Sequence, residues 1–252
     1  MTLAVQCQGI WKSYRRRPRL GIKAALLTPR APDSRFARHW ALQNVSFEVR
    51  RGQAFGIVGH NGSGKTTLLS LLLGSLLPDR GALSIHGRVA SLIEIGAGFH
   101  PELTGRENVR LFGSILGMRL REIRERYDRV AHFSELGDAV DEPLRTYSAG
   151  MIARLGFSII AHSPADVLLV DEVLAVGDAR FQDKCHEMLF AFKASGGSLV
   201  IVSHNMEALT RLCEFGLCLD SGAVAAHGPI GPVIDYYATL TANRPKAISP
   251  GK

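Results

Sequence analysis

The sequence contains few cysteines, four in 252 residues, and none of them is spaced as metal ligands are. No two form a Cys-x-x-Cys pair, and no cluster of cysteine and histidine has the spacing of a zinc site. We therefore expect neither a disulfide framework nor a structural zinc ion. Reduced, mostly buried thiols are typical of a cytosolic protein. They are Cys7, Cys185, Cys213 and Cys218.

Long hydrophobic runs are absent as well. No window approaches the ~18 uninterrupted apolar residues that a membrane-spanning helix needs. The most apolar stretch, residues 68–77, is interrupted by Ser70, Gly74 and Ser75. The amino terminus has no basic segment followed by an apolar run, so no signal peptide is expected. Any function at a membrane would then depend on a partner protein.

Acidic residues are scarce in one segment, and this explains the basic balance of the whole chain. The formal net charge is +7, and residues 12–38 hold nine lysines and arginines but a single acid, Asp33. The rest of the chain is nearly neutral, so the basicity is local. Hydrophobic residues make up 46% of the sequence, which is enough for a packed core. We expect a folded α/β domain that carries one basic insert.

Short apolar runs and helical patterns alternate along the chain, which indicates an α/β fold. Residues 54–58, 167–170 and 199–202 are typical of buried parallel strands, whereas 3–10 and 42–49 alternate as half-buried antiparallel strands do. Further strands are expected within 83–95, after a turn at 78–81, and a hairpin at 215–219 and 223–226. Helices are expected at 66–77, at 107–136 with a break near Gly117, and at 149–161.

A glycine-rich segment follows the first buried strand and matches the phosphate-binding pattern G-x-x-x-x-G-K-[ST]. Its glycines let backbone N–H groups point at phosphate oxygens, and the following helix places its positive end there. Lys65 is expected to reach the β- and γ-phosphates, and the Thr66 hydroxyl to bind Mg²⁺. A chance glycine-rich turn is the alternative, and the flanking strand and helix argue against it. The expected ATP-binding residues are Gly59, His60, Asn61, Gly62, Ser63, Gly64, Lys65, Thr66 and Thr67.

The second buried strand ends in two acids, Asp171 and Glu172. Asp171 at the strand tip can contribute to a Mg²⁺ site, and Glu172 can polarise an attacking water. Buried strands often end in solvated acids, so the pair alone is a weak signal. Behind a phosphate-binding loop it predicts ATP hydrolysis, because ligands bind at the carboxyl ends of parallel strands.

The order of these motifs resembles the nucleotide-binding domain of ABC transporters. Residues 147–151, Tyr-Ser-Ala-Gly-Met, precede a helix as the family's signature segment does, although the alanine and methionine depart from its commonest form. The resemblance implies that Ser148 and Gly150 grip the γ-phosphate of ATP bound to a second chain. It also places Asp178 at the family's D-loop acid and His204 at its switch histidine, although a lone histidine is more often structural. The implied fold is a P-loop NTPase core with a RecA-like parallel sheet, an antiparallel β subdomain and an α-helical subdomain.

Two further positions follow from the same resemblance. Glu94 is nearest to the glutamine that the family usually carries before its helical subdomain, and an acid there could face Mg²⁺ or the attacking water. Tyr14 follows the first strand, where an aromatic side chain of the family stacks on adenine. Trp40 is the rival for that role, and an ordinary loop tyrosine is the simplest alternative. The implied cofactors are ATP and Mg²⁺.

Three segments resemble one branch of the family, the ATPase subunits of exporters for lipid-linked polysaccharides such as O-antigen, capsule and teichoic acid. They are residues 94–108, 146–151 and 171–181. The resemblance implies a homodimer, two copies of an integral-membrane permease that handles the lipid-linked polysaccharide, and a peripheral place on the cytoplasmic face of the bacterial inner membrane. An exporter of a lipid, drug or peptide is the alternative. A soluble ABC ATPase acting on nucleic acid fits less well, because tandem nucleotide domains and long coiled-coil insertions are missing.

The resemblance divides the chain into a nucleotide-binding domain, 1–240, with a helical subdomain at 96–162, and a flexible tail, 241–252. Similar proteins carry an amphipathic gate segment near the membrane where this chain has its basic insert, 12–38. Interleaved leucines and basic residues there suit an anionic membrane surface or a lipid-pyrophosphate head group. A solvated basic loop is the alternative, and nucleic-acid binding lacks the aromatic interleaving of a stacking platform. Some branch members continue into a carbohydrate-binding β-domain, which we expect this subunit to lack.

Overall fold

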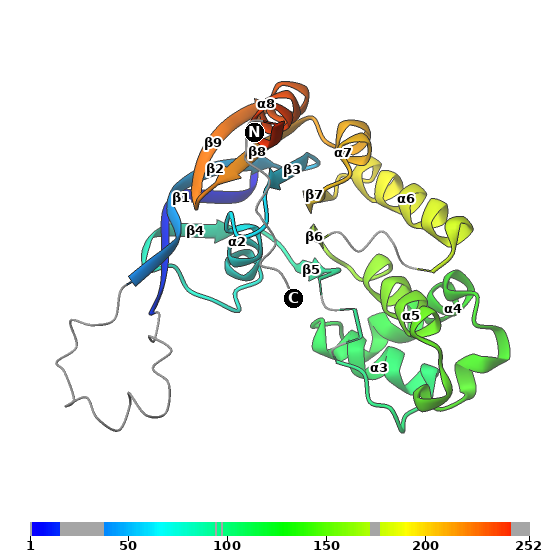
Figure 1. Ribbon diagram of the computed structural model, residues 1–252. Helices are drawn as coiled ribbons and strands as arrows, with labels where there is room; N and C mark the ends of the chain where they lie inside the picture. The colour runs from blue at the N-terminus through cyan, green and yellow to red at the C-terminus, as the bar shows by residue number, and fades with distance from the viewer. Residues whose placement is uncertain (1, 16–37, 94, 97, 172–176, 243–252) are drawn as a thin grey trace, which may run out of the picture.

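The computed structural model describes residues 2–15, 38–93, 95–96, 98–171 and 177–242. Its strands form two sheets, one of three strands and one of six, and helices lie between the sheets and around the larger one (Figure 1). This arrangement confirms the predicted α/β class, with a parallel sheet, an antiparallel sheet and added helices. Within the described ranges, no helix is long and apolar enough to cross a bilayer.

The larger sheet contains the buried parallel strands that the sequence predicts. Its order is β5-β6-β7-β3-β8-β9, and only β9 runs antiparallel to its neighbour. Because the other five run the same way, their carboxyl ends meet at one edge of the sheet, where ligands bind in such folds. The strands are β3 (Ala54–Gly59), β5 (Val89–Ser91), β6 (Val167–Asp171), β7 (Ser198–Val202), β8 (Phe215–Asp220) and β9 (Ala223–Pro229).

The smaller sheet is antiparallel and packs over one face of the larger sheet. It consists of β1 (Leu3–Arg15), β2 (Arg38–Arg50) and β4 (Arg80–Ile85), in the order β2-β1-β4. Its apolar side chains, the leucines of α2 (Lys65–Leu72) and alternate residues of the buried strands form one core cluster. A second cluster fills the other face of the larger sheet, beneath the remaining helices. The larger sheet is therefore covered on both sides, which explains why β3 and β7 are buried throughout.

The predicted helices are present, but some bounds were wrong. Helix α2 stops at Leu72 rather than at residue 77, because Gly74 has a φ of 73° and two following N–H groups bond to the carbonyl of Ser70. The stretch 107–136 contains α3 (Gly105–Ile115) and α4 (Leu120–Ser134), separated at Gly117 as predicted. Helix α5 spans Ala149–Ala161, the predicted range. The strand expected to reach residue 95 ends at Ser91, and β4 begins inside the expected turn, at Arg80.

Three helices were not predicted from the sequence. They are α6 (Ala179–Ala194), α7 (Met206–Leu212) and α8 (Ile230–Ala242). The first two begin at side-chain caps, since Asp178 accepts the N–H of Phe181 and Asn205 accepts the N–H of Ala208. Helix α8 includes residues 241 and 242, and residues 243–252 of the predicted tail lie outside the described part.

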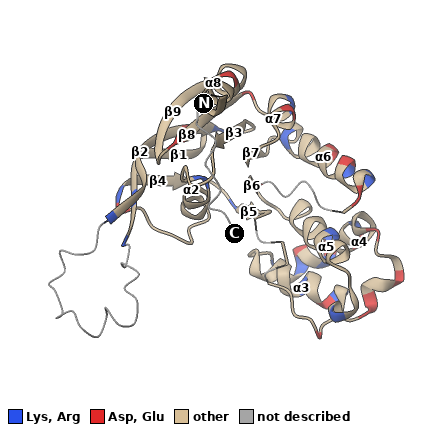
Figure 2. Ribbon diagram, viewed as in Figure 1, with Lys and Arg blue, Asp and Glu red and all other residues tan. Residues whose placement is uncertain are grey.

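Figure 1 shows α3, α4 and α5 grouped together beyond the β5 edge of the larger sheet, with α6 and α7 along the neighbouring side. Lys and Arg alternate with Asp and Glu along α4 and α6 (Figure 2). All four cysteines are buried and free. Burial raises the pKa of Cys7, Cys185 and Cys213 to about 12, so these thiols stay protonated at neutral pH.

Candidate nucleotide-binding site

The glycine-rich loop connects β3 to α2 at the carboxyl edge of the larger sheet. Gly62 and Gly64 have φ values of 81° and 108°, which residues with a side chain rarely adopt. A Cβ on Gly64 would lie 2.6 Å from the carbonyl oxygen of Ala41 on β2, whereas a Cβ on Gly62 would meet nothing within 4 Å. The loop is thus pressed against β2 on one side and open on the other.

Lys65 supplies the positive charge of this loop, and Ser63 lies buried beneath it. The Lys65 Nζ donates to the carbonyl oxygens of Gly59 at 2.6 Å and His60 at 3.0 Å, and the side chain is buried. The Ser63 Oγ is buried and has no hydrogen-bond partner among the described residues. The Lys65 ammonium at the start of α2 is a donor that phosphate oxygens accept, and the positive end of the helix dipole lies at the same place. The loop therefore fits a polyphosphate.

A hollow of about 540 Å³ opens in front of the loop, within the size range of small-molecule sites. It is lined by Tyr14, His39, Ala41, Asn61, Gly62, Gly64, Lys65, Thr66, Thr67 and Asp171. Tyr14 lies on β1, paired with His39 of β2, and is 41% exposed. Its ring is free to cover a flat base at the mouth of the hollow. Trp40 instead packs edge-on against Trp11 at 5.2 Å, so the structure brings Tyr14 to the hollow and not its rival.

Two of the predicted metal ligands reach the same hollow. Thr66 lies in the first turn of α2 and Asp171 ends β6, and both line the cavity. A hydroxyl and a carboxylate are oxygen donors of the kind that Mg²⁺ prefers, so this pair fits the ion. When bound, Mg²⁺ would neutralise phosphate charge. Glu94 and Glu172 fall outside the described residues.

His204 lies just after the end of β7, and β7 is the neighbour of β6, the strand that Asp171 ends. Asp171 pairs in register with Val202, two residues before the histidine. The Ser203 Oγ accepts the N–H of Asn205, which caps α7, and this turn exposes His204. The histidine is not among the residues that line the hollow.

The predicted signature residues lie in a different hollow, of about 510 Å³. It is lined by Glu135, Leu136, Ser148, Gly150, Met151, Arg154, Gly177 and Asp178, none of which lines the first hollow. Ser148 caps α5 by accepting the N–H of Met151 at 3.2 Å. One chain thus brings the phosphate loop together with Asp171, and brings Ser148 together with Asp178, but keeps the two groups apart.

Arg154 connects the residues that line the second hollow, and this arginine was not predicted from the sequence. Its guanidinium donates to Asp178 at 2.7 Å, approaches Glu135 at 3.5 Å and lies 5.0 Å from the ring centre of Phe181. The N–H of Phe181, followed by Arg154, lowers the pKa of Asp178. A charged residue within the apolar run of α5 was the available signal. His39 was also missed, and nothing in the sequence marks it.

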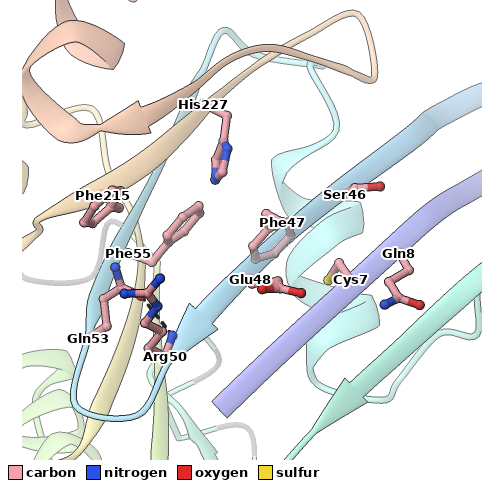
Figure 3. A pocket seen from close by; sticks show the side chains of 10 residues that line it. All are labelled: Cys7, Gln8, Ser46, Phe47, Glu48, Arg50, Gln53, Phe55, Phe215 and His227. Atoms are coloured by element: carbon pink, nitrogen blue, oxygen red, sulfur yellow. Dashed lines mark hydrogen bonds between the residues drawn. The ribbon is translucent and has the colours of Figure 1, made fainter. Parts of the chain in front are cut away.

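A third hollow, of about 400 Å³, lies between the smaller sheet and β3, β8 and β9 (Figure 3). Phe47 and Phe55 stack there at 5.1 Å, with His227 of β9 pointing towards Phe55. It shares no lining residue with the other two hollows and contains no part of the glycine-rich loop. It is therefore separate from the nucleotide site.

The ABC transporter family model matches residues 42–175, which include the glycine-rich loop, Ser148 and Asp171. The chain belongs to the ABC transporter family. It is accordingly an ABC ATPase, and the family predicted from its motifs is confirmed. It is 44% identical over 200 residues to the O-antigen export system ATP-binding protein RfbB of Klebsiella pneumoniae, covering 79% of this chain and 81% of that protein.

Other relatives and solved structures agree with this assignment. The teichoic acids export ATP-binding protein TagH of Bacillus anthracis is 37% identical over 237 residues, which are 94% of this chain but 43% of TagH. An ATP-binding subunit of an ABC transporter superposes with a TM-score of 0.78 at 20% identity, covering 96% of this chain and all of that chain. An ATP-binding cassette solved as a dimer after hydrolysis, with ADP and phosphate, gives 0.72 at 19% identity, covering 90% and 98%.

Proposed function

We propose that this chain is the ATP-hydrolysing subunit of an exporter that moves a lipid-linked polysaccharide across the cytoplasmic membrane. The observation that carries the proposal is the 44% identity to an O-antigen export ATP-binding protein over 81% of that protein's length. The partner would be an integral-membrane permease present in two copies, and the chain would lie on the cytoplasmic face of the inner membrane. An exporter of another substrate would share the site but not this relationship.

The working unit would be a head-to-tail homodimer. Its support is that Lys65 and Ser148 line separate hollows of one chain, so a second chain must bring the missing half of each site. Lys65, Thr66 and Asp171 of one chain would hold the phosphates and Mg²⁺, and Ser148 and Gly150 of the other would close over them. The solved dimer of a related fold is consistent with this arrangement.

Hydrolysis would depend mainly on positioning and charge, as phosphoryl transfer generally does. Lys65 and the loop N–H groups would orient the transferred phosphate. Glu172 would accept a proton from the attacking water, and His204, at the neighbouring strand end, would help to hold that water. Tyr14 would stack on the adenine. Asp178 would set the distance between the two chains.

The placement at the membrane rests on the segment 12–38. Of this insert, the structure describes residues 12–15, the last of β1, and residue 38, the first of β2. Residues 16–37 lie outside the described part, so the gate segment stays a prediction from the sequence. The proposed domain bounds, 1–240 with a helical subdomain at 96–162, are consistent with α3–α5 forming one group.

Deleting the gene in the producing cell tests the export function. We expect lipid-linked polymer to accumulate on the cytoplasmic side and surface polymer to disappear, while polymer synthesis continues. The wild-type gene should restore the surface polymer, and the Lys65→Ala and Glu172→Gln variants should not. Glu172→Gln should still bind ATP, because it removes only the proton acceptor. A deletion that leaves every surface polysaccharide unchanged would overturn the proposal and favour another export substrate.

A further inference from the structure

The side chain of His60 in the glycine-rich loop points away from the nucleotide hollow and joins the loop to the β8–β9 turn. Its Nε2 lies 2.7 Å from Oδ1 of Asp220, the last residue of β8, and its Nδ1 lies 2.6 Å from the carbonyl oxygen of Asn61. Both side chains are largely covered, at 21% and 28% exposed. His60 is not among the residues that line the hollow, whereas Asn61 is.

The two partners of the ring fix its orientation. A carboxylate oxygen and a backbone carbonyl oxygen lie within hydrogen-bond distance of the two ring nitrogens, so the ring connects the β8–β9 turn to the backbone of its own loop. Lys65 on α2 is a further charged group close to this residue, with its Nζ at the His60 carbonyl.

The carbonyl oxygen of the same residue organises the phosphate loop. It accepts the N–H of Ser63 at 3.1 Å and the Nζ of Lys65 at 3.0 Å. The β8–β9 turn makes a second contact with the loop, because the N–H of Gly222 donates to the carbonyl of Ser63 at 3.0 Å. That turn is itself held by Gln43 of β2, whose N–H donates to the carbonyl of Gly222 at 2.7 Å. The position of the His60 carbonyl, and with it the hydrogen bond from Lys65, therefore depends on how the side chain of His60 is held.

We propose that Asp220 and His60 form a clamp that positions the phosphate loop for ATP. The Asp220 carboxylate holds the ring, the ring holds the carbonyl oxygen of Asn61, and the carbonyl of His60 holds Lys65 where it can reach the phosphates. Loss of the Asp220 carboxylate releases the ring, loosens the loop and weakens ATP binding. Asp220 is a positioning residue, since it acts on the nucleotide through His60. The inference rests on the proposed function only in taking the loop as the ATP site.

Two substitutions of Asp220 separate the clamp from a general structural role. Asp220→Ala removes the partner of Nε2, so the dissociation constant for MgATP should rise roughly tenfold, as expected for one lost charge-assisted hydrogen bond. Asp220→Asn keeps a side chain of nearly the same size, and its amide can donate to or accept from Nε2. That variant should therefore bind MgATP nearly as well as the wild type.

The experiment measures MgATP binding to the full-length chain by calorimetry at one fixed pH. Because Asp220→Asn keeps the hydrogen bond to His60 without the charge, its recovery of affinity relative to Asp220→Ala assigns the effect to that bond. The matched control is Asp141→Ala, which removes another 2.7 Å ion pair, with Arg106, that lies away from the loop. It should bind as the wild type does.

The proposal fails if Asp220→Ala binds MgATP like the wild type, or if Asp220→Asn binds as weakly as Asp220→Ala. Thermal melting of each variant checks that it is folded. Lys65→Ala serves to separate this failure from that of the ATP site itself. If Lys65→Ala still binds MgATP at wild-type affinity, the loop is not the ATP site. If it does not bind and Asp220→Ala is unaffected, only the clamp is wrong.

Discussion

Replacing Arg154 with alanine should slow ATP turnover while leaving ATP binding nearly unchanged. Arg154 lies on α5, below Ser148, and connects this helix through Asp178 to the start of α6. It lines the second hollow and makes no part of the hollow that contains the phosphate loop. Its loss should therefore disturb the proposed contact between chains and not the first binding step.

The size of the stability loss follows from what surrounds the guanidinium. The carboxylate of Asp178 is 65% exposed, so that ion pair is screened and contributes little. The ring of Phe181 is fully buried, and a guanidinium at 5.0 Å from such a ring contributes about 1–2 kcal/mol. In a chain of this length the melting temperature should fall by roughly 2–4 °C per kcal/mol. Turnover should fall about 10- to 100-fold, as expected when a catalytic partner is misplaced.

The assays are MgATP binding by calorimetry, steady-state ATP hydrolysis and thermal melting. Arg106→Ala is the matched control, because Arg106 likewise combines an ion pair, at 2.7 Å from Asp141, with an aromatic contact, at 4.7 Å from the ring centre of Tyr127. Arg106 lines neither hollow, so this variant should keep wild-type turnover. A loss of ATP affinity in Arg154→Ala as large as its loss of turnover would refute the reasoning.

Two further predictions concern the base and the acid stability of the fold. Tyr14→Ala should raise the KM for ATP about fivefold, the cost of one aromatic contact, and leave kcat unchanged. Tyr14→Trp should keep the wild-type KM. An equal rise in Trp40→Ala would show that the wrong aromatic residue was chosen. The pKa of Glu122 is lowered, first by the N–H of Arg119 and then by the side chain of Arg88. The ionised carboxylate therefore stabilises the fold fully above the unfolded pKa of about 4.3, and this stabilisation is lost as the pH falls below that value. The urea midpoint should therefore drop between pH 5 and pH 3.5 by more in the wild type than in Glu122→Gln, and equal drops would count against this assignment.

The sequence predicts the phosphate loop and its strand well because this chemistry is local. Gly64 needs its φ of 108° in any context, and Lys65 and Thr66 are fixed by their spacing from it. Asp171 was predictable for a similar reason, since four buried apolar residues place it at a strand end. Such features depend on a few consecutive residues, and the pattern alone determines their geometry.

The features that were missed depend on residues far apart in the chain. Asp220 and His60 are 160 positions apart, and Arg154 and Asp178 are 24 apart, so no local pattern indicates either pair. Helix α6 was missed although Asp178 caps it, because the acid was read only as a catalytic residue. Helix α2 was drawn too long because its leucines continue past Gly74, where the backbone turns. Beyond the helix, Leu76 still packs against the core, whereas Leu77 is 77% exposed, so the apolar pattern continues where the helix does not.

The separation of the two hollows within one chain has a thermodynamic consequence. If ATP fills the space between two chains, it binds the dimer more tightly than the monomer, and linkage then requires that ATP strengthens dimerisation by the same factor. The ratio of ATP to ADP in the cell would then set the fraction of chains that are paired. ATP would then be both the substrate of the reaction and the ligand that promotes formation of the dimer.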